Sequence, residues 1–237
     1  MYLVLSGEGP SDLGTSQPGP RAWLLDIYIA QRIGYSLLDT RGSFIFVSEG
    51  ELAKIAKSLS TPLRGKKADS SYLANETRFF YKNARALGHW IGQQKFDAPV
   101  LALLFRDADG TASSGRGEWI TKRRSMVAGF QQESCSGGVP VVPNPKSEAW
   151  LLCALKQAYI GCHKIELEAS GNDKSPKNLK DQLNDVLMER YSKTSDRDFV
   201  SSLIRDGTIE FARLSMPSAL LVKDGLDAAI DFILSNG

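Results

Sequence analysis

The sequence has few of the features that mark secreted, zinc-binding or membrane-spanning proteins. Its 237 residues include only three cysteines, Cys135, Cys153 and Cys162, with no Cys-x-x-Cys motif, and only two histidines. An odd number of cysteines without a close pair argues against a disulfide framework and indicates a reducing compartment. So few cysteines and histidines also argue against a structural zinc site.

Two further absences limit which cellular compartment and which binding partners we expect for the protein. No apolar stretch approaches the ~20 residues that cross a bilayer, and the segment from Met1 to Glu8 has no basic region and too short an apolar run for a signal peptide. The net charge of +2 is too small to indicate nucleic acid by itself. The sequence also has no internal repeat and no low-complexity tract. We therefore expect a cytoplasmic protein without a targeting segment and without a membrane partner.

What the sequence does contain is a regular alternation of apolar runs and helical patterns. The apolar runs predict strands at 2–6, 43–47, 100–105 and 139–142. The spacing of apolar residues predicts helices at 21–33, 49–60, 71–95 and 118–132, and a further helix after Ser147. This order predicts an α/β fold with a mostly parallel sheet flanked by helices, and Pro140 indicates either an edge position or the start of the last strand.

The last third of the sequence follows a different pattern. Residues 166–178 are polar, and helical patterns follow at 177–190, 196–206, 208–214 and 217–234. We therefore expect two parts. Residues 1–160 would form a Rossmann-like α/β domain, and residues 161–237 would form a small helical appendage packed on it.

The most informative stretch is the third apolar run and the acids that follow it. Val100 to Phe105 has no polar alternation, which is typical of a strand buried on both faces, and Asp107, Asp109 and Gly110 come directly afterwards. Two carboxylates so close repel each other unless a cation lies between them, and a hard divalent ion such as Mg²⁺ or Mn²⁺ prefers oxygen ligands. On this segment alone, a metal site is no better an explanation than a helix cap beside a solvated aspartate.

Acids at the other strand ends favour the metal site. Glu8 and Asp12 follow the first predicted strand, and Glu148 lies just past the last one. The carboxyl ends of parallel strands meet at one edge of the sheet, and ligands bind at that edge in open α/β folds. Acids more than ninety residues apart in the sequence can therefore converge there.

These motifs resemble a Toprim domain, the metal-dependent fold of topoisomerases, primases and OLD-family nucleases. That family places a glutamate after its first strand and an Asp-x-Asp motif after a later strand. Here Glu8, in the segment 7–12, matches the first motif, and Asp107-Ala108-Asp109 matches the second. The segment 145–152 is similar to a Ser/Glu segment of the nuclease branch, so that the resemblance covers roughly residues 1–155.

The resemblance implies metal-dependent hydrolysis of phosphodiester bonds in DNA or RNA. Glu8, Asp107 and Asp109 would hold one or two Mg²⁺ or Mn²⁺ ions, and Asp12 or Glu148 would complete a second site. Glu8, Asp107, Asp109 and Glu148 would form the catalytic set. The similarity to small, stand-alone bacterial Toprim-like proteins also implies a partner ATPase and a role in anti-phage defence. The Gly14–Pro20 loop departs from the family's tight strand-to-helix passage and leaves the role of Asp12 open.

Several basic residues would contact the nucleic acid. They are Arg106, Lys122, Arg123, Arg124, Lys146, Lys177 and Lys180. Bunched cations are usually a solvated face, but they can also position a phosphate backbone without reading its sequence. The related proteins often carry a lysine in the helical tail that would offset charge in the transition state. Lys177, Lys180 and Lys193 are equal candidates for that lysine.

Two other functions remain open from the sequence. The segment Asp107 to Thr111 also spells the opening motif of haloacid-dehalogenase-like phosphatases, with Asp107 as nucleophile and Asp109 as general acid/base. Against this function, the motif comes late in the chain, and the acids Asp224 and Asp227 lie in a predicted helix. The second alternative is a non-catalytic Toprim-like module that binds a partner ATPase or a nucleic acid.

Overall fold

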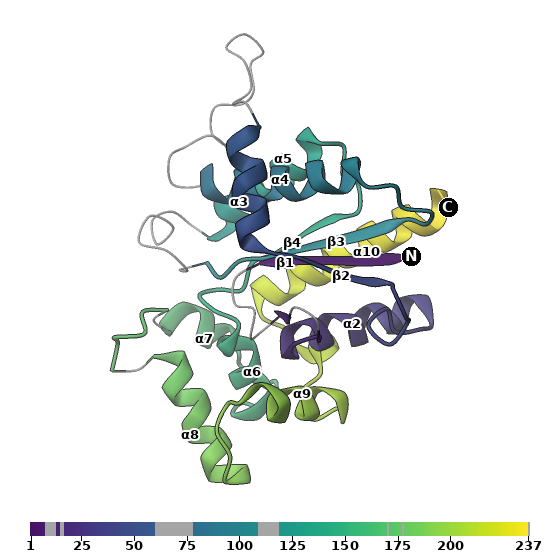
Figure 1. Ribbon diagram of the computed structural model, residues 1–237. Coiled ribbons are helices and arrows are strands. Elements are labelled where there is room, and N and C mark those ends of the chain that lie inside the picture. The colour runs from purple at the N-terminus through teal and green to yellow at the C-terminus, as the bar shows by residue number, and fades with distance from the viewer. Residues whose placement is uncertain are drawn as a thin grey trace.

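The computed structural model describes residues 1–7, 13–14, 17–59, 78–108, 119–169, 171–176 and 178–236. Its centre is a four-stranded parallel sheet with the strand order β2-β1-β3-β4 (Figure 1). The strands are β1 (Tyr2–Gly7), β2 (Phe44–Val47), β3 (Val100–Phe105) and β4 (Gly138–Val141). The predicted α/β class is confirmed. Pro140 lies on the edge strand β4, where a missing backbone N–H leaves no gap in the sheet.

The two central strands supply the core on both faces of the sheet. Leu3 and Leu5 of β1 belong to one hydrophobic cluster, whereas Val4 belongs to the cluster on the other face. In β3, Leu103 and Leu104 divide in the same way. Successive side chains of a strand point to opposite faces, so a strand covered on both faces must be apolar throughout.

Helices cover each face. On one face lie α3 (Glu49–Ser58), α4 (Arg78–Gln93) and α5 (Trp119–Gln132), and on the other lie α2 (Pro20–Ile33) and α10 (Pro217–Asn236) (Figure 1). The remaining elements, which extend the second layer, are α6 (Glu148–Leu155), α7 (His163–Glu168), α8 (Leu179–Tyr191), α9 (Arg197–Arg205) and the short 3₁₀ helix η2 (Phe211–Arg213). The result is a three-layer sandwich.

The connections reverse direction between β1 and β3. From β1 the chain passes through α2 to reach β2 on one side, whereas from β3 it passes through α5, on the opposite face, to reach β4 on the other side. The helices that follow β1 and β3 in the chain, α2 and α5, therefore lie on opposite faces of the sheet. This is the topological switch point at which open α/β sheets bind ligands.

The C-terminal helix α10 packs directly on one face of the sheet. Leu226, Ile230 and Ile233 of α10 belong to the same hydrophobic cluster as Leu3 of β1, and the helix contacts β3, β4 and α2. Tyr28 of α2 also donates a hydrogen bond to an α10 carboxylate at 3.0 Å. Residues on both sides of position 160 thus share one core, and α10 lies on the face of the sheet against β3 and β4.

A buried polar network joins α6, α7 and the start of α10. The indole Nε1 of Trp150 donates to Ser218 Oγ at 2.8 Å, and the Ser218 hydroxyl and amide both donate to Glu166, the amide at 3.1 Å. Glu166 thereby accepts from a backbone N–H in the first turn of α10, where a negative charge is favourable. Burial raises the pKa of the Glu166 carboxyl above its ordinary value.

Some boundaries in the C-terminal third differ from the sequence predictions. Residues 208–214 form only the 3₁₀ helix η2, and the polar stretch from residue 166 begins inside α7, which the apolar pattern did not reveal. A six-residue helix shows too few turns for periodicity to be read. The predicted helix 71–95 appears as α4, and its first residues lie outside the described part of the chain.

The expectation that the cysteines would be unpaired is wrong. Cys153 in α6 and Cys162 just before α7 form a disulfide, with their Cα atoms 5.3 Å apart. The two cysteines are nine residues apart in the sequence, and the turn between α6 and α7 brings them together. The sequence gave no sign of the pair because only this turn makes them neighbours. The third cysteine, Cys135, is free, and burial raises the pKa of its thiol to about 11, so it stays protonated at neutral pH.

The described helices do not have the properties of a membrane span. None of the helices in the described part of the chain combines the length and the apolar character that a bilayer span requires.

Reduction of the disulfide should lower the stability of the protein. A loop of nine residues corresponds to about 2–3 kcal/mol in the chain-entropy description, because the bond restricts the unfolded chain. Urea unfolding with and without dithiothreitol measures this difference. A Cys153→Ala/Cys162→Ala variant should not respond to the reductant, and a wild type whose midpoint ignores the reductant would contradict the bond.

The raised pKa of Glu166 predicts how stability depends on pH. A carboxyl whose folded-state pKa lies above its ordinary 4.5 contributes fully below that value, and the contribution is lost as the pH rises through the folded-state pKa. Replacing Glu166 with Gln keeps an acceptor for Ser218 and removes the titration. We therefore expect the free energy of unfolding to fall less steeply with rising pH in Glu166→Gln than in wild type.

Chemical unfolding of both proteins at a series of pH values from 4.5 upwards measures the two slopes. Asp26 is buried and also has a raised pKa, so the variant should keep part of the slope. Glu168→Gln changes an exposed carboxyl on the same helix and should leave the slope unchanged. Equal slopes in wild type and Glu166→Gln would refute the assignment.

Candidate functional site

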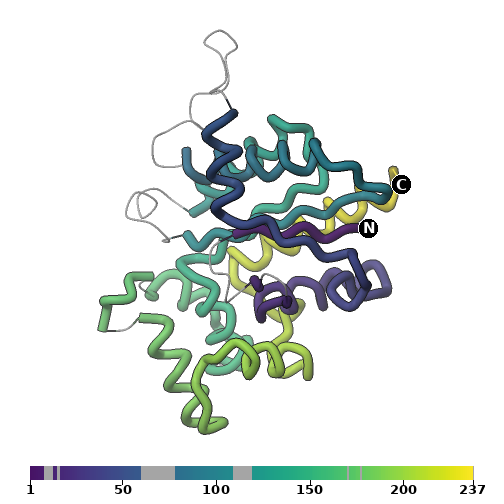
Figure 2. The backbone as a smooth tube through the Cα atoms, in the orientation of Figure 1, coloured from purple at the N-terminus to yellow at the C-terminus, as the bar shows by residue number. Residues whose placement is uncertain are grey.

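The candidate site lies where β1 and β3 end. Gly7 and Phe105 are direct partners in the parallel register, so the predicted ligand segments start from neighbouring positions at one edge of the sheet (Figure 2). A side chain at position 7 would point into the neighbouring strand. A Cβ atom on Gly7 would lie 2.3 Å from the carbonyl oxygen of Phe105. Only glycine permits this approach.

The segment after β3 is tied to the segment after β4 by backbone hydrogen bonds. The amide of Arg106 donates to Val141 O at 2.9 Å, and the amide of Ala108 donates to Pro143 O at 3.1 Å and to Pro145 O at 3.0 Å. The pairing of β3 with β4 therefore continues past the ends of both strands. Asp107 lies between the two residues that make these hydrogen bonds, so its backbone is held in place.

The side chain of Asp107 faces the start of α6. Its Oδ1 accepts a hydrogen bond from the backbone N–H of Ser147 at 3.2 Å. Ser147 is the N-cap residue of α6, and its own side chain makes no capping hydrogen bond. This amide lies at the positive end of the helix, where a carboxylate is a favourable partner. Asp107 thus links the end of β3 to the helix that bears Glu148.

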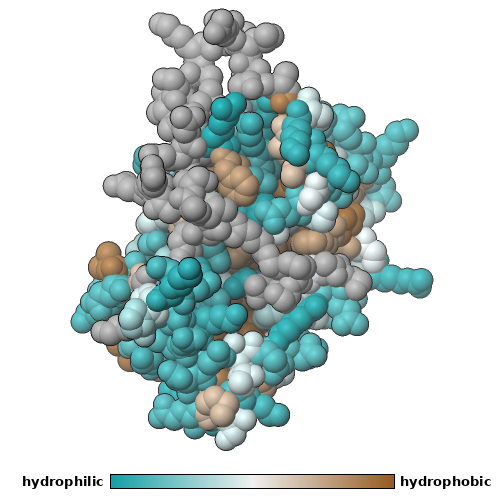
Figure 3. Space-filling view, turned by 60° about the vertical axis from the view of Figure 1, so that its left-hand side comes forward, coloured by the Kyte–Doolittle hydropathy of each residue, from teal (hydrophilic) through white to brown (hydrophobic). Residues whose placement is uncertain are grey.

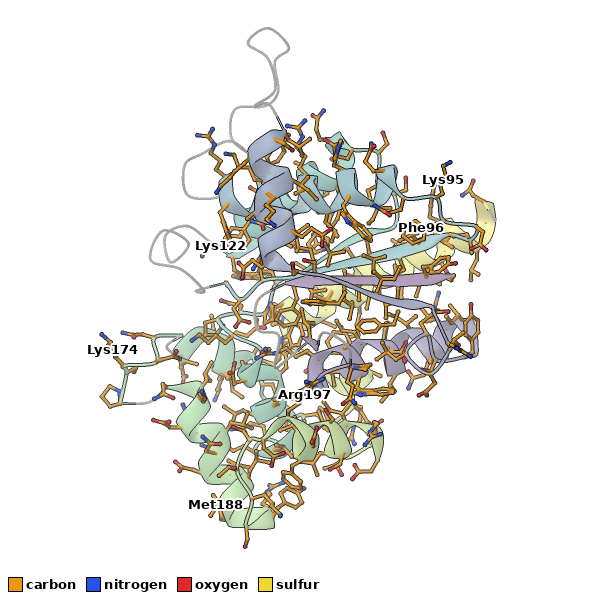
Figure 4. The ribbon with its side chains drawn as sticks, in the orientation of Figure 1. Lys95, Phe96, Lys122, Lys174, Met188 and Arg197 are labelled. Carbon is orange, nitrogen blue, oxygen red and sulfur yellow. A yellow bond between two sulfur atoms is a disulfide. The ribbon has the colours of Figure 1, made fainter. Side chains whose placement is uncertain are left out.

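Lys122 lies inside the protein beside this segment. Its side chain is 2% exposed, its ammonium donates to the carbonyl oxygen of Ala108, and it lies 5.6 Å from the centre of the Phe80 ring. Figure 4 shows it at the carboxyl edge of the sheet, on the side of α5. A lysine so deeply buried needs negative partners. The expected exposed phosphate-contacting position is therefore corrected to a buried one next to the acidic segment.

Arg106 is also an internal residue. Its guanidinium is fully buried and donates to Glu49 Oε1 and to Asn83 Oδ1, each at 2.9 Å. It also lies 5.1 Å from the centre of the Phe79 ring. This placement corrects the expectation that Arg106 contacts a phosphate backbone. Arg106 instead holds α3 and α4 against the edge of the sheet.

Glu148 faces a different neighbour from Asp107. Its Oε2 lies 3.6 Å from Arg21 Nη2, at the start of α2, and no hydrogen-bond donor in the described part of the chain reaches that buried atom. The 3.6 Å distance is an ion pair but too long for a hydrogen bond. The structure therefore brings Asp107 to the backbone of α6 and Glu148 to the side chain of α2, on the side of the sheet that carries α10.

The remaining predicted basic residues are spread over several elements. Arg123 donates to Leu221 O of α10 at 3.2 Å, and burial lowers the pKa of its guanidinium. Arg124 is exposed on α5, and Lys180 is exposed on α8. Lys146 pairs with Asp173 at 2.7 Å. Of the predicted nucleic-acid contacts within the described ranges, Arg124 and Lys180 are thus the two that present an exposed side chain.

Four predicted residues lie outside the described part of the chain. They are Glu8, Asp12, Asp109 and Lys177. Within the described residues no group of three metal-ligating side chains comes together. Of the predicted metal ligands, the structure describes Asp107 and Glu148. Asp107 accepts a hydrogen bond from the Ser147 amide, whereas Glu148 lies beside Arg21. The alternative phosphatase acids, Asp224 and Asp227, lie on α10, where Asp227 pairs with Tyr28 and Arg32.

Two arginines near the site were missed in the sequence. Arg21 occupies the first turn of α2 and lies 5.3 Å from the centre of the Phe105 ring, and Arg197 opens α9 and donates to Gln17 O. A cation in the first turn of a helix is unfavourable for the helix dipole. In the sequence, the place of each arginine at the start of a predicted helix was therefore the sign that it has another partner.

Comparisons of the chain with protein-family models, with curated proteins and with solved structures give no match. The Toprim resemblance therefore rests on the short sequence motifs alone.

The close approach of β1 to β3 predicts the effect of a small substitution. Gly7→Ala should destabilise the protein by about 1–3 kcal/mol, because the added methyl group meets the backbone of Phe105 and must push the strands apart. Thermal and urea unfolding measure the loss. Gly92→Ala adds the same group in α4 with nothing within 4 Å and should be neutral or slightly stabilising. Equal stabilities of the two variants would contradict the geometry.

Proposed function

We propose that this protein is a metal-dependent nuclease whose acidic site lies at the carboxyl ends of β1 and β3. The observation that supports the proposal is the direct pairing of Gly7 with Phe105 at the topological switch point. The predicted ligands Glu8 and Asp107 follow these two strand ends in the sequence. Sites built on the ends of adjacent central strands are held by the rigid core rather than by a loop alone.

The donor set fits a hard divalent cation. Glu8, Asp107 and Asp109 supply carboxylate oxygens, which Mg²⁺ and Mn²⁺ prefer, and Asp12 would complete the set. Such an ion, when bound, stabilises the attacking and leaving oxygens of a phosphodiester. The amide of Ser147 orients Asp107. Glu148 faces Arg21 instead, so we assign it to holding that arginine rather than to the metal.

Lys122 would offset negative charge at the site. Its ammonium is held at the carbonyl oxygen of Ala108, one residue after Asp107, and burial keeps water from screening its charge. A fixed cation there offsets the repulsion between the carboxylates and a bound phosphodiester. The sequence had left the assisting lysine open among Lys177, Lys180 and Lys193, and this placement adds Lys122 as the strongest choice.

The proposal extends to compartment and partners. Nucleic acid and divalent ions meet in the bacterial cytoplasm, and we propose that the protein acts there, alone or with a partner ATPase in anti-phage defence. In a reducing compartment the Cys153–Cys162 bond would exchange with small thiols.

Cleavage assays test the function. Supercoiled plasmid and labelled single strands are incubated with the protein in Mg²⁺, in Mn²⁺ and in EDTA. We expect cleavage only with metal, and Asp107→Asn and Glu8→Gln should each lower the rate roughly 100-fold or more, because each removes a charged metal ligand. Asp97→Asn is the matched control, since Asp97 is an exposed acid just before the other end of β3.

The pattern of losses separates the alternatives. Loss in Asp107→Asn with full activity in Glu8→Gln would contradict the proposal and favour the phosphatase, which trapping of a phosphoaspartate with beryllofluoride would support. Absence of cleavage together with metal-independent binding of nucleic acid would favour the binding module. An equal loss in Asp97→Asn would show that the substitutions act through the fold.

A further inference from the structure

A pocket of about 190 Å³ lies beside the candidate site, between the starts of α2 and α6 and the helices α8 and α9. Its inner wall is aliphatic and is formed by Leu24, Leu151, Leu183, Val200 and Ile204. The elements around it come from both sides of residue 160, so the pocket exists only in the complete fold. Its volume is below the ~300–1,000 Å³ of pockets that enclose a whole drug-sized ligand. The occupant is therefore one ring system or a short chain, with the rest of the molecule outside.

The charged side chains that line the pocket include one more cation than acids. Arg21, Lys180 and Arg197 line it together with two acids, Glu148 and Asp196. Asp196 is engaged in capping α9, since its side chain accepts from the Phe199 amide at 2.9 Å. Nothing in the described ranges forms an ion pair or hydrogen bond with the exposed Lys180 ammonium. Figure 4 shows Arg197 on the opposite side of the sheet from Lys122. This lining suits an anionic group such as a phosphate.

One lining residue, Glu148, has a polar atom without a hydrogen-bond donor in the described ranges. Glu148 Oε2 is buried and accepts no hydrogen bond from any described residue, although it forms a long ion pair with Arg21. A buried acceptor left without a donor costs about 1–3 kcal/mol. An aliphatic chain in the pocket would leave that cost in place. A nucleobase would fill the aliphatic space and could donate an N–H to this oxygen.

The pocket and the proposed site are linked through consecutive residues of the chain. Glu148 directly follows Ser147, whose amide binds Asp107, and α2 and α6 begin at the same sheet edge at which β1 and β4 end. In Figure 3, which brings this edge forward, the described surface is mostly hydrophilic and its hydrophobic patches are small and separate. A strand with one phosphodiester at Asp107 would therefore bring a neighbouring nucleotide to the pocket.

We propose that this pocket binds one unpaired nucleotide, with the phosphate at Lys180 and Arg197, the base against the aliphatic wall and a base N–H on Glu148. The identity of the ligand rests on the proposed nuclease function. A base inside a duplex cannot enter a pocket without leaving its partner, so the inference specifies single-stranded nucleic acid as the preferred substrate. A free mononucleotide has the same chemistry, and the experiment distinguishes the two.

Binding without cleavage tests the pocket. The full-length protein is titrated in EDTA against a fluorescein-labelled single strand of twelve nucleotides, against the same strand in a duplex, and against nucleoside monophosphates. We expect the single strand to bind at least about tenfold more tightly than the duplex. Lys180→Glu should weaken single-strand binding about tenfold and lower the salt dependence by about one phosphate contact.

Lys54→Glu is the matched control, because it makes the same charge change at an exposed position of α3, on the other face of the sheet. Equal effects of the two variants, or equal affinities for single strand and duplex, would overturn the proposal. Monophosphate binding that depends on Lys180, with no added affinity for the strand, would overturn the strand-holding role. Circular dichroism and melting confirm that Lys180→Glu is folded.

The test of the pocket and the test of the nuclease can fail independently of each other. Pocket binding in EDTA with no cleavage in any metal would support this inference and refute the nuclease. Metal-dependent cleavage with no Lys180-dependent binding would support the nuclease and refute the pocket.

Discussion

The parallel pairing of β1 with β3 is the constraint on which the rest of the structure depends. It sets two apolar strands in the centre of the sheet, each buried on both faces, and it brings Gly7 against Phe105 where both strands end. Because Gly7 has no side chain, the strands can end in contact rather than diverge. The helices that follow these strands in the chain, α2 and α5, lie on opposite faces of the sheet. The candidate site therefore follows from the order in which the strands join the sheet.

Charge at this edge is arranged by burial more than by surface contact. Arg106 and Lys122 both lie inside the protein, one joined to Glu49 and Asn83, the other to the carbonyl oxygen of Ala108. Removing charged groups from water is costly unless partners compensate, so each of these cations holds its neighbours in defined positions. The segment after β3 is thus fixed from two sides, by backbone bonds to the segment after β4 and by Lys122 from α5. A metal site needs this kind of support around its ligands.

The C-terminal third completes the molecule in two ways. The helix α10 covers β3 and β4 and shares their core, while α8 and α9 close the pocket against α2 and α6. Glu166, Ser218 and Trp150 join the start of α10 to α7 and α6. The disulfide between α6 and the segment before α7 restrains the same region. Stability of the tail and the shape of the pocket are consequently linked.

Much of the fold could be predicted from the sequence, because local patterns report it. Apolar runs mark the four strands, apolar spacing marks α2, α3 and α10, and Pro140 is compatible with the edge strand. The sequence also determined that Asp107 follows a buried strand. Only the tertiary structure decided which residues meet there. The cysteine pair, the burial of Arg106 and Lys122, and the ion pair of Arg21 with Glu148 all join residues from different elements, so no local pattern records them. Periodicity specifies which face of an element is buried, whereas the partner of a charged side chain depends on how the elements pack.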